Sequence, residues 1–249
     1  MNNRPLFIST FCCIDHSLDQ ALDTLVLRTS HVEILSDGLH DLLINSSPCD
    51  NHPLIYSVHA PCSEVNIAAV SERIRSASIS VLGEVLAASA RIGAEHVVVH
   101  PGFTQYEQVR DRSFESLLRS LNDLARLQDE HGVRVCIENM GAWECCHFRT
   151  PAFLPELSTR GLGCTLDCGH ARPNGNLNEF LAVGEFCHVH LHDNGGTVDD
   201  HLACGTGVIN FSDTLQQLPS QAILVVETRE LLAAEQSISY LSSLLNGEE

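Results

Sequence analysis

The sequence predicts a parallel (β/α)8 barrel, and three observations support this fold class. The chain has 249 residues, and such barrels typically take about 250 residues. Short runs rich in β-branched residues alternate with helical patterns about eight times, which is typical of βα units around a parallel sheet. Histidine and carboxylate side chains also stand at the ends of most predicted strands from the third onward. We therefore expect a single barrel domain that covers residues 1–249.

Eight segments have the composition of buried strands. Residues 97–99 and 223–226 are continuous aliphatic runs, as expected for strands that are covered on both faces. The eight predicted strands are residues 5–9, 31–35, 54–59, 96–100, 134–138, 162–167, 186–191 and 222–227.

Apolar residues recur at three- and four-residue steps between the strands, which predicts amphipathic helices. The first pattern covers residues 70–92, is closed by Gly93, and is expected to be the longest helix. A second pattern covers residues 114–124 and ends near Gly132, and a third covers residues 231–245. The connections after predicted strands two, five and six look short or irregular.

The charge and composition exclude several classes of protein. The chain carries 14 basic and 32 acidic residues, a net charge of −18, which opposes binding to the phosphate backbone of a long nucleic acid. No apolar run approaches the ~20 residues that would span a bilayer. Residues 1–7 lack the basic and apolar pattern of a secretion signal, so we expect a cytoplasmic protein. The eleven cysteines are odd in number and scattered, which favours reduced thiols over disulfides.

Potential metal ligands follow or end the predicted strands. Because a barrel gathers the carboxyl ends of its strands around one axis, we expect these side chains to converge on one cleft. A mixture of imidazoles and carboxylates suits Zn²⁺ or Mn²⁺, and we expect one to three such ions per chain. The nine candidate ligands are His59, His100, Glu138, Asp167, His170, His190, Asp199, His201 and Glu227.

The carboxylates are stronger evidence for a metal site than the histidines. A lone histidine at a strand end, such as His59 or His100, is more often a hydrogen-bonded structural residue. Glu138 and Glu227 end apolar strands, where an unpaired buried charge is very costly. Asp167 and His170 are separated by a loop short enough to present both to one cleft.

Other polar residues near the predicted cleft have weaker assignments. His188, His192 and Asp193 are expected to support the ligands through hydrogen bonds. Trp143 either stacks on a substrate or packs its own loop, and Arg172 is the arginine best placed to contact an anionic substrate. Arg149 and Arg229 are weaker substrate candidates. Structural roles are expected for Cys136, Cys164 and Cys187 and for His16, His31, His40, His52, His96, His131 and His147.

Four motifs together resemble the xylose isomerase-like TIM-barrel superfamily, which includes sugar and sugar-phosphate isomerases or epimerases and endonuclease IV-type AP endonucleases. The resemblance covers roughly residues 5–246. Its motifs are His100-Pro101-Gly102, Ile137-Glu138-Asn139, Leu166-Asp167-Cys168-Gly169-His170, and Asp199-Asp200-His201 before Gly205-Thr206-Gly207.

The endonuclease IV branch implies three metals. The resemblance assigns His59, His100 and a bridging Glu138 to the first metal. It assigns His170, Asp199 and His201 to the third. The second metal would be held by Glu138, Asp167, His190 and Glu227.

The isomerase branch implies one metal on the same four residues as the second metal, with Glu138 and Glu227 as acid and base. The basic and aromatic DNA-gripping loops of the endonuclease branch have no match here, so a small phosphorylated or sugar substrate is expected rather than a duplex. Two functions stay open, hydrolysis of a small phosphodiester or phosphate ester by metal-activated water and sugar isomerisation or epimerisation. The residues expected to carry catalysis are Glu138, Glu227 and His170.

Overall fold

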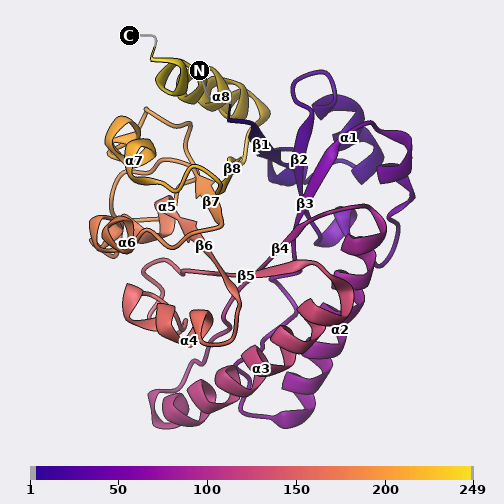
Figure 1. Cartoon of the computed structure of the whole chain (residues 1–249), viewed down its shortest axis with the longest axis vertical. Coiled ribbons are helices and arrows are strands. Elements are labelled where there is room, and N and C mark those ends of the chain that lie inside the picture. The colour runs from indigo at the N-terminus through magenta and orange to yellow at the C-terminus, as the bar shows by residue number, and fades with distance from the viewer. Residues whose placement is uncertain (1–3, 248–249) are drawn as a thin grey trace.

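The computed structural model describes residues 4–247 and confirms the predicted fold class. Its strands form a closed parallel barrel in the order β1 to β8, with β8 pairing with β1, and the ring of strands is visible in Figure 1. The strands are β1 (Leu6–Ser9), β2 (His31–Leu35), β3 (Ile55–His59), β4 (His96–Val99), β5 (Arg134–Glu138), β6 (Gly163–Asp167), β7 (His188–Leu191) and β8 (Ile223–Val226).

The helices surround the barrel and differ greatly in length. They are α1 (Leu18–Leu25), α2 (Glu72–Arg91), α3 (Arg110–His131), α4 (Leu154–Ser158), α5 (Cys168–Ala171), α6 (Leu177–Val183), α7 (Phe211–Gln217) and α8 (Leu231–Asn246). Single 3-10 turns are η1 (Thr10–Cys13), η2 (Gly38–His40), η3 (Ser47–Asn51), η4 (Glu107–Val109) and η5 (Pro151–Phe153). Only 3-10 turns follow β2, and only short helices follow β5 and β6, as predicted.

The prediction that the helix over residues 70–92 is the longest is wrong, because α2 has 20 residues and α3 has 22. The turn η4 runs directly into Arg110, so α3 begins before its first apolar position. The apolar pattern of α2 also fails in its first turns, where Ile74 is 54% exposed while Arg75 and Ser78 are buried. Arg75 pairs with Asp123 of α3 at 2.7 Å, a polar contact that a hydrophobic pattern does not reveal.

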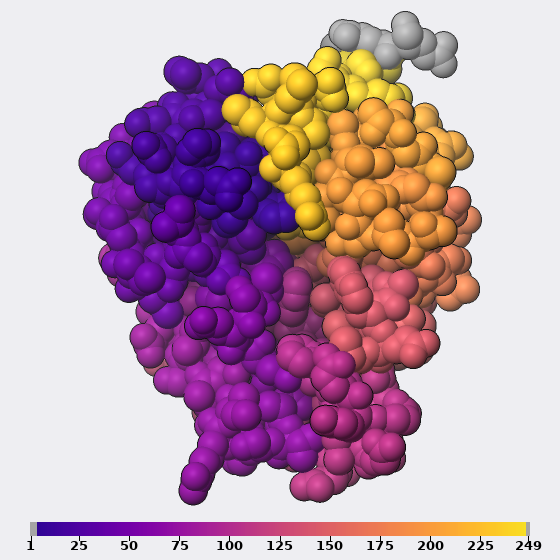
Figure 2. Space-filling view, turned by 180° about the vertical axis from the view of Figure 1, so that it is seen from behind, coloured from indigo at the N-terminus to yellow at the C-terminus, as the bar shows by residue number. Residues whose placement is uncertain are grey.

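The barrel closes where the two ends of the chain meet. Leu6 of β1 pairs with Leu224 of β8, and Ile8 pairs with Val226. Figure 2 shows the yellow C-terminal residues lying against the indigo N-terminal ones. All eight strands run in one direction, so their carboxyl ends, and the residues that follow them, lie on one face of the barrel. Within the described part of the chain, no helix is both long and apolar enough to cross a membrane.

Candidate metal centre

The nine predicted ligands lie together at the carboxyl end of the barrel. His59, Glu138 and Asp167 are the last residues of β3, β5 and β6. His190 lies in β7, while His100 and Glu227 directly follow β4 and β8. His170 lies in α5, the turn after β6, and Asp199 and His201 lie in the loop between β7 and α7. Their side chains form three adjoining groups.

The first group joins two histidines to one carboxylate oxygen. Glu138 Oε2 lies 3.2 Å from His59 Nε2 and 3.0 Å from His100 Nε2. The rings of His59 and His100 meet edge to face, with centroids 4.9 Å apart. One ligand atom from each of these three residues lies within 4.8 Å of the others, a separation that one metal ion could span.

The second group uses the other oxygen of Glu138. His190 Nδ1 lies 3.1 Å from Glu138 Oε1, 3.6 Å from Asp167 Oδ2 and 3.5 Å from Glu227 Oε2. All four side chains are nearly inaccessible to solvent. Three buried carboxylates around one imidazole nitrogen need a positive charge among them.

The third group is centred on Asp199. Its Oδ2 lies 2.9 Å from His201 Nε2 and 3.4 Å from His170 Nε2. Its Oδ1 is buried and has no hydrogen-bond partner among the described residues, which leaves an acceptor free for a cation. His170 Nδ1 lies 3.4 Å from Glu138 Oε1, so the third group adjoins the second.

Three histidines present the same ring nitrogen to the carboxylates. The Nδ1 atoms of His59, His170 and His201 lie 2.8, 2.9 and 2.9 Å from the main-chain carbonyls of Ala60, Asn139 and Glu227. Because each Nδ1–H donates to a carbonyl, each Nε2 carries a lone pair that faces a carboxylate. A proton or a metal ion must lie between two such acceptors, and a ligand histidine is commonly held by this second hydrogen bond.

The electrostatics of the metal-free centre follow from this geometry. Burial alone would lower the pKa of His201, but its hydrogen bond to Asp199 and the nearby charge of Glu227 raise that pKa to about 9. Burial opposes ionisation of Asp199, yet hydrogen bonds from His170 and His201 hold the pKa of that carboxyl well below its usual range. Asp199 therefore stays charged, and His201 holds a proton that a divalent cation would replace.

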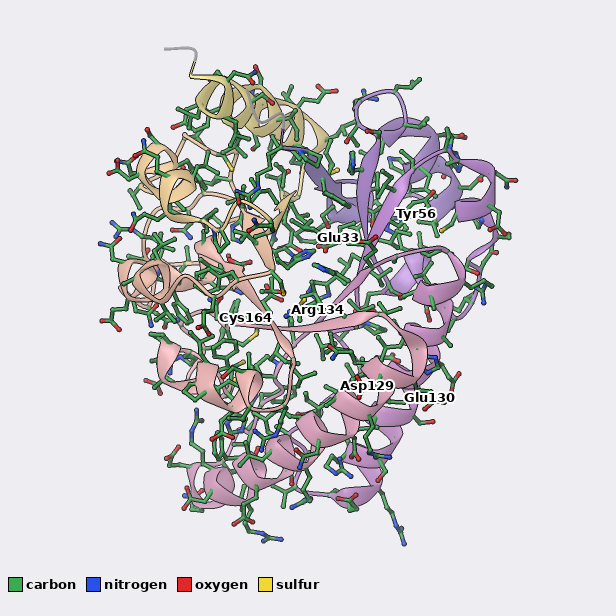
Figure 3. All side chains as sticks on the ribbon, in the orientation of Figure 1. Glu33, Tyr56, Asp129, Glu130, Arg134 and Cys164 are labelled. Carbon is green, nitrogen blue, oxygen red and sulfur yellow. The ribbon has the colours of Figure 1, made fainter. Side chains whose placement is uncertain are left out.

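Sequence reasoning missed Glu33, a fully buried carboxylate in the middle of β2. Its Oε1 lies 2.9 Å from His190 Nε2, and its Oε2 lies 2.7 Å from His188 Nε2. It points toward the middle of the ring of strands (Figure 3). The signal was present in the sequence, since a carboxylate inside an aliphatic strand must be paired, but Glu33 does not stand at a strand end.

Two residues predicted as supports contact the centre or its loops. His192 Nε2 lies 3.1 Å from Asp167 Oδ1. Asp193 accepts hydrogen bonds from the main-chain amides of Gly205, Gly207 and Ile209. Asp193 therefore holds the loop that follows Asp199 and His201.

The centre lines a cavity of about 180 Å³ whose other walls are apolar. Those walls are Phe11, Leu35, Cys62, Met140 and Trp143. Trp143 is 43% exposed, and its ring packs edge to face on the ring of His170, with the ring centroids 5.3 Å apart.

None of the three arginines proposed as substrate contacts is among the described residues that line the metal-centre cavity, and their role stays a prediction. Arg172 lines a separate depression with Leu177 and Asp213. Arg149 donates to the carbonyl of Gly141, and the guanidinium of Arg229 lies 5.9 Å from the ring centre of Phe11. The residues lining the metal-centre cavity, within the described part of the chain, include no arginine.

Comparison with known proteins assigns the family. The family model described as "Xylose isomerase-like TIM barrel" matches residues 47–244. The chain belongs to this family. It is 34% identical over 223 residues to the uncharacterized protein MJ1614 of Methanocaldococcus jannaschii, covering 88% of this chain and 89% of that protein. It is 29% identical over 204 residues to a probable endonuclease 4 of Mycobacterium ulcerans, covering 76% and 78%.

Solved structures share the whole fold. A D-tagatose 3-epimerase-like protein superposes with a TM-score of 0.89 at 25% identity, covering 98% of both chains. A Thermus thermophilus protein, TTHB071, soaked with ZnCl2, superposes with a TM-score of 0.79 at 24% identity over 99% of both chains. Proteins similar to this chain thus include one described as epimerase-like and one described as a probable endonuclease.

Proposed function

We propose that this protein is a metal-dependent hydrolase of small phosphodiesters or phosphate esters. The observation that carries this proposal is the joining of three ligand groups through Glu138, which offers one oxygen to His59 and His100 and the other to His190. A single-metal enzyme has no use for so many converging donors, whereas a metal cluster needs them all. The preferred ions are Zn²⁺ or Mn²⁺, because the donors are imidazoles and carboxylates.

Each group would hold one cation. His59, His100 and Glu138 would hold the first, and His170, Asp199 and His201 the third. The second would lie among Glu138, Asp167, His190 and Glu227. When bound, such cations lower the pKa of water and neutralise the phosphoryl oxygens.

The chain's own residues would orient and enclose the reacting groups. Asn139 places its carbonyl 2.9 Å from His170 Nδ1, so His170 keeps its Nε2 directed at Asp199. Glu33 contacts His190 Nε2 at 2.9 Å, so the Nδ1 of His190 stays directed at Glu138. The apolar walls formed by Phe11 and Trp143 exclude bulk water from the cavity, which strengthens every charge interaction inside it.

The charges of the cavity support a compact substrate. Without an arginine in the described cavity walls, the negative charge of a phosphoryl group would be balanced by the cations alone. The net charge of −18 also gives a long duplex no electrostatic attraction. A small phosphodiester or phosphate ester fits this balance better than a long duplex.

A sugar epimerase is the second candidate, and one specific observation favours it. Glu138 and Glu227 both approach His190 Nδ1, at 3.1 and 3.5 Å, so one cation could lie between two carboxylates able to move a proton. The superposition on the D-tagatose 3-epimerase-like protein supports this alternative.

The substitution His201→Ala separates the two chemistries. His201 belongs to the third group and not to the four-ligand set that an epimerase needs. We expect phosphoesterase turnover to fall by about 100-fold or more, since metal-ion catalysis contributes several kcal/mol. The assay would screen small phosphodiesters, phosphomonoesters and ketoses with Zn²⁺ or Mn²⁺.

The control is His16→Ala, an exposed histidine away from the cavity, which should leave turnover unchanged. The choice between the two functions would be reversed if the protein epimerised a sugar and cleaved no phosphoester. In that case His201→Ala should change only the affinity for the sugar.

A further inference from the structure

A second group of metal-ligand side chains lies toward the amino end of the barrel. His96 is the first residue of β4, Cys136 lies in β5, and Cys187 directly precedes β7. One donor atom from each residue lies within 4.8 Å of the other two. These residues belong to none of the three ligand groups at the carboxyl end, and their side chains have no role in the proposed hydrolysis.

The intervening strand makes room for the two cysteines. β6 separates β5 from β7, yet the Sγ atoms of Cys136 and Cys187 are 3.1 Å apart. Gly163 of β6 is paired with Cys136 in the sheet. A Cβ atom at this glycine would lie 2.8 Å from Cys136 Sγ and 2.5 Å from Cys187 Sγ. Any other residue at position 163 would therefore displace the thiol pair.

The strand spacing argues against a disulfide between these cysteines. Neighbouring strands lie roughly 4.8 Å apart, so Cα atoms two strands apart are roughly 9 Å from each other. A disulfide needs its two Cα atoms within about 7 Å. Two sulfurs bound to one tetrahedral zinc at about 2.3 Å are about 3.8 Å apart, which small side-chain rotations can provide.

The two thiols share one proton in the metal-free chain. The hydrogen bond from Cys136 and the charge of Arg134 outweigh burial and lower the pKa of Cys187 to about 6, while burial and the same contact raise the pKa of Cys136 well above its usual range. Burial and the neighbouring His188 lower the pKa of His96 to about 4. A thiolate and a neutral imidazole are the forms that bind metals. The guanidinium of Arg134 offsets the charge of a second thiolate.

Cys187 is the member of the group that lines a solvent-facing depression, whereas Cys136 is fully buried and His96 contacts a histidine of the barrel interior. A depression of about 380 Å³ is lined by Arg134, Cys164 and Cys187, and the first two are labelled in Figure 3. On the inner side, His96 Nδ1 lies 3.5 Å from His188 Nδ1. His188 is fixed in turn by Glu33, so His96 has the hydrogen-bonded support typical of a ligand histidine.

We propose that His96, Cys136 and Cys187 bind one Zn²⁺ ion, with the fourth coordination position open to the depression. Sequence analysis gave these three residues structural roles, because their spacing along the chain forms no recognised motif. The barrel brings them together from three strands. This site is independent of the proposed hydrolase function.

Cobalt substitution tests the proposal directly. Thiolate ligands give Co²⁺ a near-ultraviolet charge-transfer absorption that imidazole and carboxylate ligands do not give. We expect this band in the Co²⁺-loaded protein, and we expect Cys136→Ser and Cys187→Ser each to remove it together with one bound metal per chain. Cys145→Ser is the matched control, because Cys145 is a half-buried free cysteine like Cys187 and belongs to neither proposed metal site, and it should keep both the band and the metal.

A second measurement on the wild-type chain covers the case in which the serine variants do not fold. Alkylation mapped by mass spectrometry should show Cys187, the half-buried thiol of the pair, protected by Zn²⁺, with the half-buried Cys145 labelled equally in either condition. The proposal would be overturned by equal labelling of Cys187 with and without Zn²⁺ or by a band that survives in both serine variants. It would also be overturned by a band lost in Cys145→Ser or by a Cys136–Cys187 disulfide.

Discussion

Glu33 of β2 and Glu138 of β5 are buried carboxylates that contact the two ring nitrogens of His190, at 2.9 and 3.1 Å. Glu138 ends its strand, where the barrel geometry predicts a functional residue. Glu33 stands mid-strand, and its partners His188 and His190 come from β7, on the far side of the barrel. Contacts across a barrel interior depend on strand register, which the sequence pattern does not supply.

At Glu138, replacing the carboxylate by an amide should damage activity more than folding. Glu138→Gln nearly preserves shape but removes the charge that both adjoining ligand groups share. We expect turnover to fall by at least about 100-fold, on the scale of metal-ion catalysis, with fewer metals bound per chain. Turnover and metal content both at wild-type levels would reassign Glu138 as a structural residue.

At Glu33, the substitution Glu33→Gln should weaken metal binding from a distance. The amide keeps the size of the side chain but lacks the negative charge with which Glu33 orients His190. We expect metal affinity to fall by about 10- to 100-fold, as for other supporting residues, measured by chelator competition. Glu84→Gln on the exposed face of α2 is the control, and an equal affinity in both variants would contradict a positioning role.

At the scale of elements, the strands follow the sequence closely while the helix faces do not. Residues 31–35 and 134–138 form β2 and β5 at the predicted bounds, because short runs rich in Val, Ile and Leu favour strands. The first turns of α2 instead bury Arg75, which donates to Ser120 of α3, and Ser78, which accepts from the main-chain amide of Asn66. Polar contacts of this kind are not marked by an apolar period in the sequence.

This contact predicts a stability change. Arg75 is buried and donates to Asp123 and Ser120 of α3, so Arg75→Met would leave the partly buried Asp123 with only the exposed Arg126 as a charged partner. We expect a loss of about 1–3 kcal/mol in the free energy of unfolding, less than for a fully buried pair. Urea denaturation measures it, with the exposed Arg73→Met as control; equal stability of the two variants would contradict the assignment.

At the scale of the whole molecule, the sequence predicted the barrel and the meeting of nine side chains on one face. Both follow from the strand count and from the strand ends, since the topology of a parallel barrel leaves no choice of face. The sequence did not reveal that Arg172 lines a separate depression or that His96, Cys136 and Cys187 come together. Both features depend on how the loops and the first residues of the strands pack. The extent of the domain over residues 1–249 stays a prediction.

The centre also predicts how stability depends on pH. The pKa of His201 is raised to about 9 in the metal-free protein. A raised pKa gives stability that is full below the unfolded value, about 6.5, and is lost as pH rises through 9. The metal-free chain should therefore lose stability between these values.

The metal-loaded chain should not lose stability over that range, because metal binding strengthens as ligands deprotonate. Thermal unfolding with and without a chelator measures the difference. A metal-free chain of constant stability from pH 6 to 9 would contradict the paired protonation of Asp199 and His201.

We propose that three cations share the face that carries Glu138, and anomalous scattering at the zinc edge from crystals of the zinc-loaded protein would locate them. We expect three peaks among the nine ligands, with Glu138 between two of them. A single peak held by Glu138, Asp167, His190 and Glu227 would rule out the three-metal cluster and favour the epimerase.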